Sequence, residues 1–203
     1  MPRPPVLAAP ARAALALAAA CLAGVAMSFG QTYTPGALAP FFNSATPVVA
    51  LSGAVALAGR GWASHVALGA LAGPLAMAGY YATATLRGFA ASPSWVVLWC
   101  VAGLVAGSAM GAAAWALRGH GPWPMRGLAA AVFPAVALGE ALHGLVRIST
   151  STPVAYWWTQ ALVGVAVLAW LAGTRLRGAR ERAVAVFATA VLAPALFLIY
   201  GAV

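Results

Sequence analysis

The sequence contains no lysine and no aspartate, and charged residues make up only 6% of its 203 positions. Soluble globular domains carry about 25% charged residues, so this scarcity excludes a soluble fold. A hydrophobic content of 64% also excludes a disordered chain. Only two cysteines are present, Cys21 and Cys100, and both lie in apolar runs, which predicts neither a disulfide framework nor a metal motif. The composition predicts an all-α, polytopic membrane bundle in which residues 1–203 form a single domain.

Apolar segments of roughly 20 residues are long enough to cross a ~30 Å hydrocarbon core as helices. About seven such segments are present, and all are expected to be transmembrane helices. The least certain of them is the second, at 43–59, because it is short and contains Pro47. A six-span alternative therefore treats residues 30–58 as a loop and a re-entrant segment. The predicted spans are 13–29, 43–59, 64–86, 94–117, 127–147, 153–173 and 183–203.

The arginines decide between the two topologies, because basic residues concentrate on the cytoplasmic side of a membrane. With seven spans, nine of the eleven arginines fall on one side and only Arg87 and Arg147 on the other. Without the second span the split is seven to four. The sequence therefore favours seven spans in a bacterial plasma membrane, with the N-terminus cytoplasmic and the C-terminus outside. The nine are Arg3, Arg12, Arg60, Arg118, Arg126, Arg175, Arg177, Arg180 and Arg182.

Polar groups near the predicted cytoplasmic face have simple interpretations. Glu181 lies in the run 177–182 and is expected to be an exposed partner of its arginines, while the run contacts anionic lipid headgroups. His65 and His120 are expected to be solvated or interfacial. The arginines form no patch with interleaved aromatics, so no nucleic-acid partner is expected.

Small residues recur at four-residue spacing in two predicted spans, at Gly69 and Gly73 and at Gly103, Gly107 and Gly111. Such stripes let helix backbones approach closely. We expect intramolecular packing here, with the seam of a homo-oligomer as the alternative.

Glu140 is the one acid predicted inside the membrane, where acids usually face the protein interior and serve a function. His143 and Arg147 follow at spacings that share its helical face. We therefore predict a catalytic or coupling role for Glu140, with His143 as its partner. The alternatives are a structural Glu–His pair that ties this helix to tyrosine or glutamine side chains, and a mononuclear metal site.

Polar and aromatic side chains gather in the predicted outer half of the membrane. An aromatic belt explains the tryptophans but not the amides beside them. We therefore predict a substrate site near Glu140 that holds no metal or other cofactor. Its candidate residues are Gln31, Tyr33, Asn43, Tyr80, Tyr81, Trp95, Trp99, Tyr156, Trp157 and Gln160.

Several strings along the chain resemble those of a family of small multi-pass proteins from actinobacteria, most of them uncharacterised. More loosely, the size, the spans and the embedded acid resemble the small integral-membrane terpene cyclases. The strings are GQTYTPGALAP at 30–40, NS at 43–44, GPLAMAGYY at 73–81, WVVLW at 95–99 and GEA at 139–141.

The cyclase resemblance implies a protonation-initiated reaction on a lipophilic prenylated substrate that enters from the lipid. Burial in a low dielectric favours the neutral acid that such a reaction needs, and aromatic faces stabilise the carbocation. Glu140 would then protonate an alkene or epoxide, and His143 would orient or return the proton.

The alternative function is substrate binding or transport. The outward position of the polar cluster is similar to the capture components of energy-coupling-factor vitamin importers, whose site lies beneath the first outer loop. A proton-coupled transporter that uses Glu140 is a related possibility.

Overall fold

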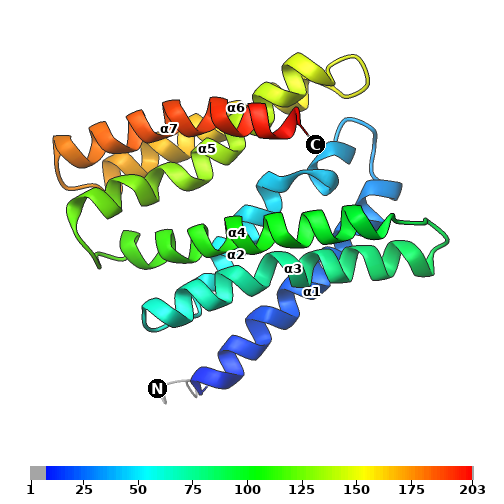
Figure 1. Ribbon diagram of the computed structural model, residues 1–203, viewed down its shortest axis with the longest axis horizontal. Helices are drawn as coiled ribbons and strands as arrows, with labels where there is room; N and C mark the ends of the chain where they lie inside the picture. Colours follow the sequence, from blue (N-terminus) through cyan, green and yellow to red (C-terminus); the bar gives the residue numbers. More distant parts are fainter. Residues whose placement is uncertain (1–7, 203) are drawn as a thin grey trace, which may run out of the picture.

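The computed structural model describes residues 8–202, and all regular secondary structure in that range is helical. Seven α-helices and one short 3-10 helix, η1, follow one another along the chain (Figure 1). The predicted helical bundle is confirmed, and most predicted bounds lie within four residues of the observed ones. The elements are α1 (Ala9–Tyr33), η1 (Ala39–Asn43), α2 (Ala45–Ala56), α3 (Trp62–Leu86), α4 (Pro93–Leu117), α5 (Trp123–Arg147), α6 (Val154–Thr174) and α7 (Ala179–Tyr200).

Six of these helices are long and apolar enough to cross a membrane, and α2 is not. Its 12 residues rise only about 18 Å at 1.5 Å per residue. The prediction of a full span at 43–59 is therefore wrong. The turn-forming residues Pro35, Gly36 and Pro40 interrupt the chain before α2, and the helix begins only after Ser44.

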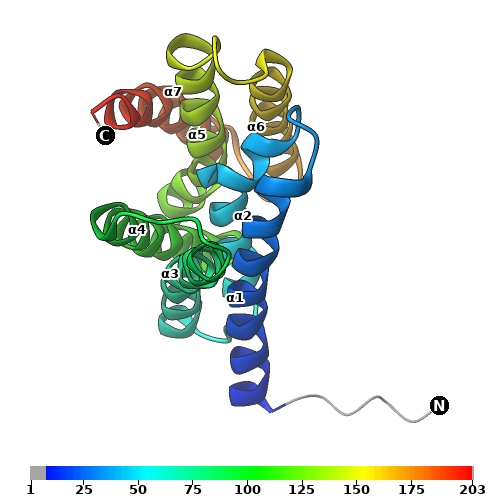
Figure 2. The same cartoon turned by 90° about the vertical axis from the view of Figure 1, so that its right-hand side faces the viewer.

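The helices pack as two groups (Figure 2). Helices α1, α3 and α4 form the first group with α2, and α5, α6 and α7 form the second. Helix α2 packs against α3 and α4 and also touches α5, so it lies where the groups meet. Many large apolar side chains on the long helices face outward, for example Leu162 and Phe187 at 68% and 72% exposure. A soluble monomer rarely exposes apolar area on this scale, whereas a lipid-facing surface requires it.

The predicted glycine stripes pack directly against each other across α3 and α4. A Cβ atom on Gly69 would lie 2.3 Å from the carbonyl oxygen of Gly107, and one on Gly111 would lie 2.3 Å from that of His65. Gly73 meets Gly103 in the same way. The prediction of intramolecular packing is therefore confirmed. Only glycine permits this backbone contact.

Successive helices run in opposite directions, and the start of α1 and the end of α7 lie at opposite ends of the bundle (Figure 1). Eight of the described arginines lie at the end where α1, α3, α5 and α7 begin, which we call the arginine-rich end. Arg87 and Arg147 lie at the arginine-poor end, at the close of α3 and α5. Arg3 lies outside the described residues. The eight are Arg12, Arg60, Arg118, Arg126, Arg175, Arg177, Arg180 and Arg182.

Candidate functional site

Glu140 is buried on α5, with 6% of its surface exposed, and it meets the N-terminus of α2. Its Oε1 accepts a hydrogen bond of 2.7 Å from the backbone N–H of Ala45. Its Oε2 accepts one of 3.0 Å from the backbone N–H of Thr46. The first N–H groups of a helix have no partner inside that helix, and they carry partial positive charge. Glu140 supplies that partner from a helix almost a hundred residues further along the chain.

Three side chains complete the shell around Oε2 of Glu140. The hydroxyl groups of Ser44 and Thr46 donate at 2.6 and 2.7 Å, and the amide of Gln160 donates at 3.1 Å. Gln160 also donates to the carbonyl of Ala137 at 3.2 Å, which fixes its orientation on α6. The Glu140 network therefore consists of Ser44, Ala45, Thr46, Glu140 and Gln160.

All five contacts of the Glu140 carboxylate come from donors. This geometry favours a structural role for Glu140 over a catalytic one. The network joins α2 to α5 and α6 and so holds the two helix groups together. Ser44 and Thr46 were absent from the predicted site. Hydroxyl side chains directly before a short apolar run are an N-cap signal that points to them.

His143 lies one turn beyond Glu140, yet the expected hydrogen bond between them does not form. The Nδ1 atom of His143 is buried and meets no hydrogen-bond partner among the described residues. Its ring packs at 5.6 Å from that of Tyr200 on α7. The helical spacing places both side chains on one face of α5, but the carboxylate turns toward α2 and the imidazole toward α7.

A second polar cluster lies between the last turns of α1 and α3, at the arginine-poor end. The hydroxyl of Tyr80 donates to Oε1 of Gln31. These two side chains border a cavity of about 390 Å³, which we call the Gln31–Tyr80 pocket. The pocket is lined by Ser28, Gln31, Thr32, Tyr80, Ala84 and Phe89.

Arg87 lies beside this pocket and is held by aromatic faces. Its guanidinium carbon lies 4.5 Å from the ring centre of Phe29 and 5.2 Å from those of Tyr33 and Phe89. It also donates to the carbonyl of Ser28 at 2.7 Å. Cation–π contacts of this kind hold a guanidinium group against the aromatic faces.

The predicted site residues thus divide between two places. One group gathers at the ends of α1 and α3 and consists of Gln31, Tyr33, Tyr80 and Tyr81. The rings of Tyr80 and Tyr81 contact each other edge to face. The remaining residues either belong to the Glu140 network, pack in the bundle, or are exposed. Gln160 and Tyr156 lie at or beside Glu140, Trp157 is buried against Gly144, Trp99 is half-buried on α4, and Asn43 and Trp95 are exposed.

Two predictions at the arginine-rich end are wrong. Glu181 is buried, with 4% exposure, and pairs with Arg126 of α5 while accepting a bond of 2.7 Å from the backbone N–H of Arg177. His65 is 1% exposed, because the turn at Gly59 and the glycine stripe of α4 close over it. His120 is exposed as expected and stacks on Trp115.

For the metal alternative, no group of three or more potential ligands from histidine, cysteine and acidic residues occurs within residues 8–202. The carboxylate of Glu140 is also surrounded by five donors, which fill the positions that a cation would need.

Comparisons with known proteins identify a family but no annotated relative. No curated protein and no solved structure matches the chain. One family model matches residues 3–203, which is almost the full length of the sequence. The chain therefore belongs to the family of unknown function DUF6518.

Proposed function

We propose that the protein binds a small, water-soluble molecule in the Gln31–Tyr80 pocket, as the capture or transport component of a bacterial plasma-membrane system. The pocket itself carries this proposal. Its volume of about 390 Å³ lies within the range of about 300–1,000 Å³ typical of small-molecule sites. If basic residues mark the cytoplasmic side, the arginine-poor end faces outward and the pocket opens toward the external solution.

The lining suggests the chemistry of the ligand. Tyr80 donates to the carbonyl oxygen of the Gln31 amide, so the N–H groups of that amide can serve a ligand. Arg87 adds a fixed positive charge at the rim, and Phe89 adds an apolar face. A metabolite with a flat or apolar body and a carboxylate or carbonyl group matches these three features.

The cyclase hypothesis finds less support in this geometry. It needs a neutral acid directed into an aromatic cavity, whereas Glu140 is enclosed by five donors and does not line the Gln31–Tyr80 pocket. Conversion of a prenylated epoxide by purified protein, with no cofactor added, would restore the cyclase as the leading hypothesis.

A ligand screen on purified protein in nanodiscs tests the proposal. The unfolding temperature is measured against a panel of vitamins and carboxylated metabolites, and any ligand that raises it is titrated calorimetrically. Tyr80→Phe should weaken binding about fivefold, the value of one hydrogen bond. Tyr156→Phe is the control, because it removes a phenolic hydroxyl at the same end of the bundle but outside the pocket. It should bind the ligand with the affinity of the wild type.

Two results would contradict the proposal. One is the absence of any stabilising ligand across the panel. The other is an identified ligand whose affinity is unchanged by Tyr80→Phe and by Gln31→Ala, because both side chains border the pocket.

A further inference from the structure

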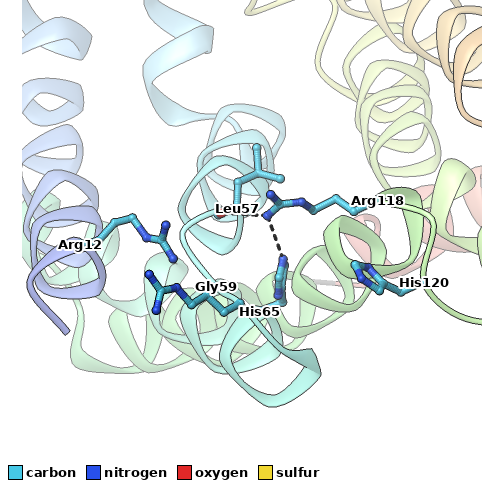
Figure 3. A pocket seen from close by; sticks show the side chains of 7 residues that line it. Arg12, Leu57, Gly59, His65, Arg118 and His120 are labelled. Carbon is cyan, nitrogen blue, oxygen red and sulfur yellow. Dashed lines mark hydrogen bonds between the residues drawn. The ribbon is translucent and has the colours of Figure 1, made fainter. Parts of the chain in front are cut away.

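A second cavity, of about 220 Å³, lies at the arginine-rich end, where α1 and α3 begin and α2 and α4 end (Figure 3). Three arginines and two histidines surround it, and its lining contains no acidic residue. We call it the Arg12–Arg118 pocket. It is lined by Arg12, Leu57, Gly59, Arg60, His65, Arg118 and His120.

Within residues 8–202, no acidic side chain lines this pocket as a counter-ion to its arginines. The whole chain contains only two acids, Glu140 and Glu181. Glu140 is held at the N-terminus of α2, and Glu181 pairs with Arg126. Guanidinium groups that share a small cavity repel each other unless an anion joins them. The two acids of the chain are therefore committed elsewhere, and the anion has to come from outside the chain.

The side chains are positioned rather than loosely solvated. Arg118 donates to the carbonyl of Leu57 at 3.2 Å, and its guanidinium contacts Nε2 of His65 at 3.4 Å (Figure 3). Nδ1 of His65 lies 2.9 Å from the carbonyl of Gly61. A carbonyl can only accept, so Nδ1 carries the proton and Nε2 accepts from Arg118. His65 thus orients the guanidinium group of Arg118.

Arg12 provides an independent sign of a missing partner. Its Nε atom is buried and meets no hydrogen-bond acceptor among the described residues. A buried donor without an acceptor is costly, and such groups are usually satisfied by a ligand or an ordered water. Figure 3 shows the side chain of Arg12 directed toward the cavity, opposite Arg118.

We propose that the Arg12–Arg118 pocket binds a phosphate group, supplied by the headgroup of an anionic lipid or by a soluble phosphate compound. Guanidinium groups match the geometry of phosphate oxygens, and several can share one phosphate. The N-terminus of α3 beside Arg60 adds partial positive charge. Basic pockets between transmembrane helices on the cytoplasmic side are a known form of lipid headgroup site.

Two measurements on purified protein distinguish the sources of phosphate. Native mass spectrometry counts retained lipid after exchange into detergent containing cardiolipin, with phosphatidylcholine as the neutral comparison. Thermal unfolding in detergent compares inorganic phosphate with chloride at equal ionic strength. Arg60→Gln is the principal variant, because the Arg60 side chain is exposed and its removal leaves the fold intact. Arg12→Gln is the second, and Arg180→Gln is the control of equal charge at the same end.

Retention of cardiolipin, or stabilisation by phosphate over chloride, is expected for the wild type and for Arg180→Gln. Arg60→Gln and Arg12→Gln should each lower the affinity for cardiolipin or phosphate about tenfold, which corresponds to the loss of one charge-assisted hydrogen bond. A lipid effect without a phosphate effect assigns a headgroup site, and the reverse assigns a soluble ligand. Absence of both effects, or equal losses in all three variants, overturns the proposal. Tyr80→Phe should leave both effects unchanged, so this test is independent of the Gln31–Tyr80 pocket.

Discussion

Substitution of Glu140 tests whether this residue holds the two helix groups together. Glu140→Ala removes the acceptor of all five hydrogen bonds and leaves the first N–H groups of α2 unpaired within the protein. Glu140→Gln is milder. Its remaining oxygen can keep the contacts of Oε2, but its NH₂ group then faces the backbone N–H of Ala45, donor against donor.

The size of the effect follows from the number and the type of these contacts. At the average of about 0.6 kcal/mol for hydrogen bonds between membrane helices, five bonds contribute about 3 kcal/mol. Leaving buried donors without an acceptor adds about 1–3 kcal/mol. We therefore expect Glu140→Ala to lower the free energy of unfolding by about 4–6 kcal/mol. Glu140→Gln should lower it by about 2 kcal/mol, the cost of one unsatisfied buried donor.

Titration with denaturing detergent in mixed micelles, followed by tryptophan fluorescence, measures these differences. Ser108→Ala is the matched control, because the Ser108 hydroxyl is exposed and bonds only within α4. It should change stability by less than about 0.5 kcal/mol. If Glu140→Gln is as stable as the wild type, the carboxylate does not hold α2, and the structural interpretation fails. Loss of an enzymatic activity at unchanged stability would instead indicate a catalytic acid.

Two further predictions concern packing and charge. Gly107→Ala should destabilise the protein by about 1–3 kcal/mol, because its Cβ would lie 2.1 Å from the carbonyl oxygen of Gly69. The control is Gly173→Ala, whose added Cβ faces open space and which should be neutral or slightly stabilising in the same detergent titration. Glu181→Gln should cost about 3 kcal/mol because it leaves Arg126 without its buried partner, and a coupling below about 0.5 kcal/mol in a double-mutant cycle with Arg126→Gln would contradict that pairing.

The sequence was sufficient to predict the positions of the long helices and the glycine-mediated contacts between two of them. Apolar length alone located six spans, and the four-residue spacing of Gly103, Gly107 and Gly111 identified a packing face that the structure confirms. Both signals are local. A span is recognised from its own residues, and the glycine stripe of α4 packs against the stripe of α3, the helix directly before it in the sequence. The unequal distribution of arginines between the two ends was predictable for the same reason.

The polar residues were harder to place, because their partners lie far away in sequence. Glu140 could be identified as buried, but its partner at Ala45 is 95 residues away and is a backbone N–H group, which no side-chain pattern marks. Helical spacing suggested His143 as that partner, although a shared helical face does not fix where two side chains point. The length of α2 was misjudged because the apolar run at 43–59 resembles a span while the helix stops after 12 residues.

The scarcity of charge connects the two sites. The carboxylates of both acids lie at a helix N-terminus. That of Glu140, a residue of α5, contacts the first turn of α2. Glu181 is in the first turn of α7, and its carboxylate accepts from the backbone N–H of Arg177. A carboxylate is stabilised at a helix N-terminus, so these positions are the least costly for a buried acid. No acidic side chain is then left for the arginines around His65. The fold thus leaves a cationic cavity with no acidic residue in its lining at the arginine-rich end, and an external phosphate is the anion that best matches its guanidinium groups.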